Sequence, residues 1–333
     1  MQIITDKAGW REAITRQVRY DFYHTYEYHA LHNNGEPLLF VFENGDERLC
    51  LPLLMRSIEG TPYYDLTSVY GYAGCLYNTE NPSEALLQKF RDEMTEYLFD
   101  REVISVFSRL HTLIPNALLI PDGMGEVVAL NRTVYIPVSE PETYQTSLYA
   151  DTLKRQLAAI TNKGLSVRAA TTMDDWMAFY KIYTRSMDEK QAPDEYFFST
   201  SYMLGLRNAA EFKPHLLLAE YKGEVVAGAL FMVCGEIMQY HLGGVLPEFR
   251  DLSPLKLLID HGRHLASGMK LRYLHLGGGN SAVDNGLFQF KSRFSHHFST
   301  FHIWKWVVDE DIYEHLSEGL PEGRFPRYRN MMG

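Results

Sequence analysis

Side chains that could take part in a reaction are concentrated in the second half of the chain. Lys291 follows Phe290 in a short apolar helix, where a fixed cation could stabilise developing negative charge or bind a phosphate; the alternative is an exposed helix lysine. Tyr240 and His241 are neighbours in an expected strand, so their side chains face opposite sides and only one can face a cleft. His241 could act as a base near neutral pH, but core tyrosines and histidines are equally common.

The strand that carries Tyr240 ends in a pair of glycines. Gly243 and Gly244 precede Val245 and would let a bound molecule approach the backbone closely; the alternative is a bulge that ends the strand. Arg250, in the next turn, could hold a phosphate through two hydrogen bonds, or it is a surface arginine. We therefore expect this segment, as far as Ser253, to bind one of the reactants.

Two further segments could line a site. Tyr70 and Tyr72 share a facing direction if their segment is extended, and they would line a pocket between domains or pack at the domain interface. Gly277, Gly278 and Asn280 form a glycine-rich loop that lacks the Lys-Ser/Thr of a phosphate-binding loop. We expect this loop at the mouth of the site.

The pattern of the second half predicts the element order β-α-α-β-β-β-α-β-α-β. Short glycine-containing links join the three consecutive strands, as in hairpins. Ser253 as N-cap, Pro254 at the first helical position and Gly268 at the end delimit one helix. The expected strands cover 165–170, 215–221, 224–233, 237–245, 273–276 and 298–307. The other expected helices cover 174–187, 196–207 and 287–294.

The first half is a fainter copy of the same order, with a strong hairpin signal at Asn44-Gly45. Helix 83–99 and strands 103–107 and 126–138 follow. This repetition indicates a tandem duplication in an α/β fold with mixed sheets. We expect two domains, 1–145 and 146–333. Arg324, Arg327 and Arg329 near the end predict a solvated tail.

Composition narrows the class of protein. The 333 residues include 46% hydrophobic and 22% charged residues, which is typical of a globular protein with two cores. A net charge of −10 disfavours nucleic acid as the main partner. No signal peptide or membrane-spanning run is visible, and Cys50, Cys75 and Cys234 suit neither a disulfide framework nor a zinc site. We therefore expect a cytoplasmic protein that binds no metal.

The motifs of both halves resemble the FemAB-type branch of the GNAT acyltransferase superfamily. The run from Tyr240 to Val245, followed by Leu-Pro-Glu-Phe-Arg, is similar to the end of the central GNAT strand and its turn. Leu276-Gly-Gly-Gly followed by Phe290-Lys291-Ser-Arg-Phe is similar to the loop and "F-K-x-x-F" helix of FemAB-type proteins. Ser68 to Gly74 resembles their "P-Y-G-Y-x-G" segment.

The resemblance implies two tandem GNAT-like domains and direct acyl transfer to an amine, without metal or covalent enzyme intermediate. It places acyl transfer at Lys291, with His241 and Tyr240 nearby. It makes the segment from Gly243 to Ser253 the donor side. Tyr70, Tyr72, Gly277, Gly278 and Asn280 would then form the acceptor side.

The resemblance also suggests reactants. The expected donor is an acyl-CoA, although Arg250-Asp-Leu-Ser-Pro-Leu255 lacks the glycines of the usual pyrophosphate-binding loop. The expected acceptor is the amine of a small molecule or cell-envelope precursor. Two alternatives stay open: an aminoacyl-tRNA-dependent peptidoglycan bridge transferase, disfavoured by net charge and a missing helical arm, and a catalytically silent binding protein.

Overall fold

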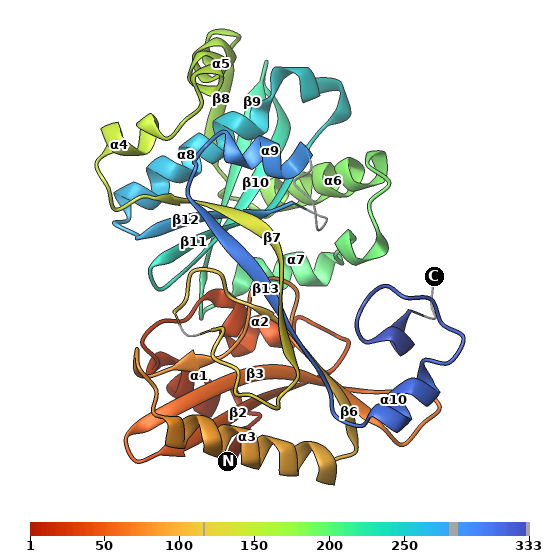
Figure 1. Ribbon diagram of the computed structural model, residues 1–333. Coiled ribbons are helices and arrows are strands. Elements are labelled where there is room, and N and C mark those ends of the chain that lie inside the picture. Colours follow the sequence, from red (N-terminus) through yellow and green to blue (C-terminus); the bar gives the residue numbers. More distant parts are fainter. Residues whose placement is uncertain (116, 280–285, 331–333) are drawn as a thin grey trace. The chain divides into compact units, whose positions relative to one another are not determined.

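The computed structural model describes residues 1–115, 117–279 and 286–330 (Figure 1). The chain folds into two compact units. Unit 1 contains Met1–Leu130 together with Thr300–Gly333, and unit 2 contains Asn131–Ser299. The expected domains, 1–145 and 146–333, differ from this division at both ends of unit 2. The chain passes between the units within strand β7 (Glu126–Pro137) and again within β13 (Phe298–Val307).

The sheet of unit 2 has the strand order β8-β9-β10-β11-β12-β7. Its pairs are antiparallel except for β11 and β12, which run parallel. The strand bounds are Leu165–Ala169 for β8, Lys213–Tyr221 for β9, Glu224–Cys234 for β10, Ile237–Val245 for β11 and Tyr273–Gly278 for β12. The sequence-based strands of the second half are confirmed to within a few residues.

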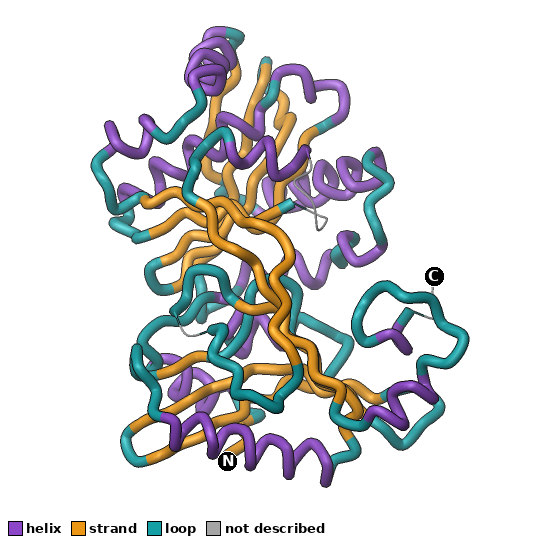
Figure 2. Tube along the Cα trace, in the orientation of Figure 1, coloured by secondary structure: helices purple, strands orange, loops and turns teal. Residues whose placement is uncertain are grey.

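Helices cover both faces of this sheet (Figure 2). Gly228 of β10 contacts Phe179 of helix α6, whereas Phe231 of the same strand contacts Gly262 of α8. Residues an odd number of positions apart in a strand point to opposite faces, so α6 and α8 lie on opposite faces. The bounds are Glu142–Ser147 for α4, Asp151–Asn162 for α5, Met173–Glu189 for α6, Thr200–Asn208 for α7, Pro254–Gly268 for α8 and Gly286–Ser292 for α9.

Unit 1 repeats this topology with the order β1-β2-β3-β4-β6-β13, with the short strand β5 beside β3. Here too the fourth and fifth strands in the order, β4 and β6, form the parallel pair. The bounds are Gln2–Ile4 for β1, Glu36–Asn44 for β2, Glu47–Ser57 for β3, Tyr64–Thr67 for β4, Leu76–Tyr77 for β5 and Val103–Leu110 for β6. The expected hairpin at Asn44-Gly45 is confirmed, with Gly45 at φ 60°.

The sixth strand of each sheet explains why the two compact units differ from the expected domains. β7 follows the first half in the sequence but pairs with β12 of unit 2, from Tyr273–Pro137 to Gly278–Thr133. β13 follows the second half but pairs with β6 of unit 1, from His302–Leu110 to Val307–Ser105. Each half of the sequence therefore gives its last strand to the sheet of the other half.

The helices of unit 1 are α1 (Lys7–Thr15), α2 (Tyr26–Ala30), α3 (Glu84–Asp100) and α10 (Glu310–Leu316), with short 3-10 helices at η1 (Phe22–His24) and η4 (Arg327–Arg329). α3 buries Leu86, Phe90, Met94 and Leu98, one turn apart, against the sheet. In unit 2 the core forms between the sheet and α8, with Leu258, Ile259 and Ala266 facing it.

The arginine-rich tail is anchored in unit 1 and is not a freely solvated terminus. Asp65 of β4 is fully buried and accepts hydrogen bonds from Arg56 at 2.7 Å and from Arg329 at 2.9 Å. The hydroxyl of Tyr328, in the same 3-10 helix as Arg329, donates to Asp65 at 3.2 Å. A buried carboxylate is stable only when it is paired in this way.

We expect Asp65→Asn to lower the free energy of unfolding by roughly 3 kcal/mol, because two arginines then lose their buried counter-charge. Glu322→Gln is the control, since Glu322 pairs with Arg327 at 3.2 Å but is 91% exposed. Urea denaturation followed by circular dichroism measures both. Equal stabilities of the two variants would contradict an anchoring role for Asp65.

Candidate active site

The parallel strands β11 and β12 separate near their centre. Their described ladder runs from Ile237–Tyr273 to Gln239–His275. β11 continues to Val245, still paired with β10, and β12 continues to Gly278, still paired with β7. The two strands are therefore held apart from outside, and a gap opens between them in the middle of the sheet.

A side-chain hydrogen bond lies at the last pair of this ladder. His275 Nδ1 and Gln239 Oε1 are 2.6 Å apart, and both side chains are buried. This contact joins the strands at the point beyond which they diverge. Sequence reasoning missed it, because residues so far apart in the chain carry no spacing signal.

A β-bulge sets the directions of the next two side chains of β11, those of Tyr240 and His241. Leu230 of β10 pairs with Leu242 and Phe231 pairs with Tyr240, so His241 is the extra residue. The ring of Tyr240 packs 5.5 Å from that of Phe231, toward α8. His241 faces the other side, where its Nε2 lies 3.0 Å from the hydroxyl of Tyr202 on α7. The two side chains thus face opposite sides, as expected.

Lys291 of α9 lies at this divergence and not on an exposed edge. Its side chain is only 8% exposed, its Nζ donates to the carbonyl of Gly278 at 2.7 Å, and Nζ is 5.9 Å from the centre of the Tyr240 ring. One lysine therefore contacts residues of both diverging strands. Removal from water lowers the pKa of Lys291 to about 7.

Tyr240 is the second titratable group beside this amine. Its partly buried hydroxyl lies over Gly243, where an added Cβ would meet the oxygen at 2.0 Å. Burial raises the pKa of Tyr240, so the phenol is neutral near physiological pH and can donate a hydrogen bond. Lys291 and Tyr240 are thus the expected catalytic residues that the structure brings together, whereas His241 lies on the other face of the strand.

The glycine pair has a packing role. A Cβ on Gly244 would lie 2.8 Å from the backbone of Tyr183, so this glycine lets α6 approach β11 closely. Gly243 leaves room for the Tyr240 hydroxyl because it has no side chain, and Val245 is buried in the core of unit 2. The β-bulge lies at His241, before the glycines, and the close approach of a donor to them stays a prediction.

Positive side chains gather where α8 begins. Ser253 stands at the N-cap position in a left-handed conformation, at φ 54°, and its hydroxyl makes no capping bond; instead Lys256 Nζ donates to it at 3.4 Å. Partial burial, and then the charge of Arg293, lower the pKa of Lys256. Arg250 is exposed and has an ion pair of 3.9 Å with Glu189.

The expected acceptor residues fall in different places. Tyr70 and Tyr72 belong to unit 1, where Tyr28 donates to the carbonyl of Tyr70 at 2.9 Å and the Tyr72 ring packs against those of Tyr23 and Phe301. Gly277, at φ 73°, and Gly278 end β12 in unit 2, where Gly278 binds Lys291. Asn280 lies outside the described residues.

Among the residues that the structure describes, no group of three or more His, Cys, Asp or Glu side chains could hold a metal ion, and no helix could cross a bilayer. The three cysteines are buried, and none is in a disulfide.

The lowered pKa of Lys291 has a consequence for stability. Between pH about 7 and 10.5 the unfolded chain binds the proton that the folded chain has released, so this residue makes the free energy of unfolding rise with pH. We expect the stability of the wild type relative to Lys291→Met to increase between pH 7 and pH 10, by as much as a few kcal/mol. Denaturation of both proteins at several pH values measures this difference. A constant difference would mean that the folded amine titrates as it does in water.

Comparison with known proteins shows which folds this chain resembles. Residues 149–292 match the family model described as acetyltransferase (GNAT) domain. A search of curated protein sequences gave no match. The crystal structure of FemX superposes with a TM-score of 0.74 at 11% identity, covering 95% of this chain and 99% of that one.

Two other solved structures match over similar lengths. L-PGS from Bacillus licheniformis has a TM-score of 0.59 at 8% identity, covering 92% of this chain and 93% of that one. A C-terminal domain provisionally assigned to lysylphosphatidylglycerol synthetase, from Agrobacterium fabrum, has a TM-score of 0.58 at 14% identity, covering 92% and 94%. The chain therefore has a GNAT/FemAB-type fold, and the segment that matches the GNAT domain model, residues 149–292, contains the diverging strands and Lys291.

Proposed function

We propose that this chain transfers an acyl or aminoacyl group from an activated donor to an amine. The observation that carries the proposal is the position of Lys291, whose amine contacts both strands where β11 and β12 separate. The described ladder between β11 and β12 ends at Gln239–His275, and we propose that backbone N–H groups of β11 beyond this point bind the donor. Backbone donors and a cation beside one gap suit a reaction in which negative charge develops on a carbonyl oxygen.

In the proposed reaction the acceptor amine attacks the carbonyl carbon of the donor. A C–N bond forms, the C–S or C–O bond to the donor's carrier breaks, and the proton lost by the amine reaches the leaving sulfur or oxygen. Protonated Lys291 would stabilise the oxyanion of the tetrahedral intermediate, and the neutral Tyr240 hydroxyl could supply a proton to the leaving group.

An acyl-CoA is the donor we propose first. GNAT-type domain character over residues 149–292 supports it, as does the gathering of Arg250, Lys256 and Arg293 around the start of α8. The mutual repulsion of Lys256 and Arg293 would be relieved by a bound phosphate. Pro254 removes one backbone N–H from that helix end, so side chains would replace part of the usual backbone grip.

Aminoacyl-tRNA is the second candidate, favoured by likeness to FemX and to structures named for lysylphosphatidylglycerol synthesis. The acidic net charge of the whole chain opposes tRNA binding less than the overall composition suggests, because the charge is unevenly distributed. Residues 131–299 carry 18 Lys and Arg against 17 Asp and Glu, whereas the remaining residues carry 14 against 25. Unit 2 is nearly neutral, so an anionic donor would meet little repulsion there.

For the acceptor we propose the amine of a small molecule or of a cell-envelope precursor, with the Gly277–Gly278 turn contributing to its site; a contribution of Tyr70 and Tyr72 stays a prediction. A cytoplasmic location follows from these proposed reactants and stays a prediction.

We expect Lys291→Met to lower kcat by roughly a hundredfold and to change donor affinity less, because its interaction strengthens as charge develops. Lys181→Met, which removes an exposed lysine of α6, should retain normal turnover. Single-turnover kinetics test this. Normal turnover in folded Lys291→Met would contradict the catalytic role of the amine.

Calorimetric titration with CoA and with aminoacyl-tRNA distinguishes the donors. For a CoA donor we expect Arg250→Ala to weaken CoA binding about tenfold, since an exposed phosphate contact contributes on the order of 1 kcal/mol, while Arg207→Ala on α7 leaves it unchanged. Binding of aminoacyl-tRNA alone would favour the second candidate. Binding of neither would favour a catalytically silent protein.

A further inference from the structure

Helix α9 needs outside support to hold Lys291 in place. It covers only Gly286–Ser292, and a helix of two turns is not stable by itself in water. Its first turn is supported through Phe288, because the guanidinium of Arg132 lies 4.9 Å from the ring centres of both Phe288 and Phe298. The last turn, which carries Lys291, is supported by a different segment.

The last turn is held by the segment between α4 and α5. Phe294 is fully buried, and its ring meets that of Tyr149 edge-on at 5.5 Å between centres. The N–H of the next residue, Ala150, donates to the carbonyl of Arg293 at 2.9 Å, and the N–H of Phe294 donates to the carbonyl of Lys291 at 3.0 Å. Tyr149 and Ala150 therefore contact residues close after Lys291 and hold them in place.

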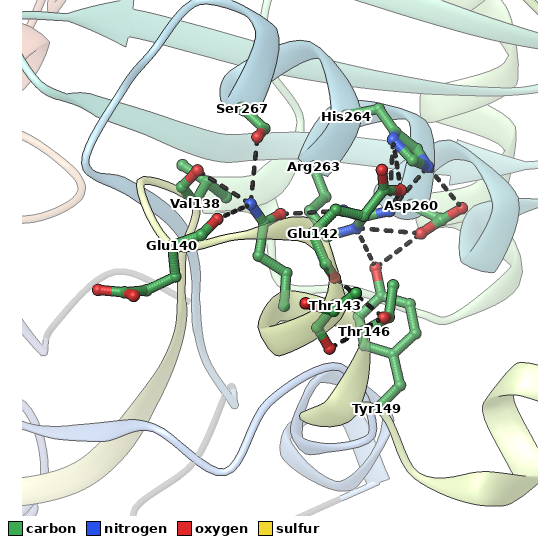
Figure 3. Close-up of polar contacts among 11 residues, drawn as sticks. Val138, Glu140, Glu142, Thr143, Thr146, Tyr149, Asp260, Arg263, His264 and Ser267 are labelled. Carbon is green, nitrogen blue, oxygen red and sulfur yellow. Dashed lines mark hydrogen bonds and ion pairs between the residues drawn. The ribbon is translucent and has the colours of Figure 1, made fainter.

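Tyr149 is itself fixed by an ionic cluster on α8, shown in Figure 3, in which Arg263 is buried and Asp260 is partly buried. Its hydroxyl donates to Asp260 at 2.7 Å and accepts from the Nε of Arg263 at 2.8 Å. Arg263 is 1% exposed and also donates to Gln145 at 2.9 Å. Gln145 in turn donates to the carbonyls of Val138 and Glu140, at 3.0 and 2.6 Å, so the cluster ties α8 to the segment before α5.

A cluster of this kind is costly for stability alone. Burying an arginine and a carboxylate is on average no more stabilising than an apolar core of the same volume. Such a cluster does, however, fix directions, because each partner accepts or donates along defined lines. The hydroxyl of Tyr149 uses both its donor and an acceptor position, which fixes its ring, and the ring supports Phe294.

We propose that Tyr149, held by Asp260 and Arg263, is a positioning residue that keeps the last turn of α9, and with it the amine of Lys291, at the divergence of β11 and β12. The proposal rests on the function proposed above for Lys291, but its physical content is the position and hydration of one amine. It can therefore be tested without a substrate.

The test measures the pKa of Lys291 by NMR in protein labelled with [13Cε]lysine, with the resonance assigned by its loss in Lys291→Met. Burial lowers this pKa, and the described groups beside Nζ are the Gly278 carbonyl and the neutral ring of Tyr240. Removing the Tyr149 ring should loosen α9 and admit water. We expect Tyr149→Ala to raise the pKa by one unit or more, a tenfold or greater change in the proton affinity.

Two further variants make the result decisive. Tyr149→Phe keeps the ring and loses only its two hydrogen bonds, and it should raise the pKa by a smaller, measurable amount. Tyr77→Phe in unit 1 removes a comparable buried hydroxyl, which donates to Leu119, and should leave it unchanged.

An unchanged pKa in folded Tyr149→Ala would overturn the proposal and leave Tyr149 as a packing residue. If that variant does not fold, Tyr149→Phe decides: a lower melting temperature with an unchanged pKa overturns the proposal. Failure of the proposed function would look different. In that case the pKa would shift as expected, but Lys291→Met would have normal turnover.

Discussion

An amine held away from water beside a backbone carbonyl is the constraint on which the rest of the site depends. Lys291 gives up most of its hydration for the hydrogen bond to Gly278 and the face of Tyr240. Such burial costs free energy unless it is compensated, and side chains in this situation concentrate at functional sites. The amine keeps its place only if β12, β11 and α9 are each held by something else, namely β7, β10 and the segment at Tyr149.

The two units differ in the region beyond their parallel strand pair. In unit 1 the region beyond the parallel pair β4–β6 is closed by the chain itself. The N–H of Ser68 donates to Phe107, the N–H of Arg109 donates to the Ser68 hydroxyl, and the N–H of Ala73 donates to Arg109. Among the described residues between β6 and β7 there is also no helix corresponding to α9. Among the described residues, the sheet of unit 2 thus has diverging strands beside a buried lysine, whereas the corresponding region of unit 1 is closed by the chain.

Sequence patterns predicted local elements well and partners poorly. Alternation and glycine punctuation identified the strands of unit 2, and Pro254 marked the start of α8, because these signals lie within a few residues of each other. The exchange of β7 and β13 was not predictable, since a sequence pattern shows which residues form a strand but not which other strand it pairs with. The contacts of His275 with Gln239 and of Arg263 with Tyr149 were missed for the same reason.

The glycine pair illustrates how packing acts on the site from a distance. Any side chain at Gly244 would push α6 away from β11, because the nearest atoms are backbone atoms of Tyr183, which cannot rotate aside. A side chain at Gly243 would displace the hydroxyl of Tyr240, whose ring lies beside Lys291. Both glycines thus affect the divergence of the strands through packing: one sets the position of the strand, and the other sets the direction of its tyrosine. The donor role that the resemblance implies for this segment stays a prediction beside this packing role.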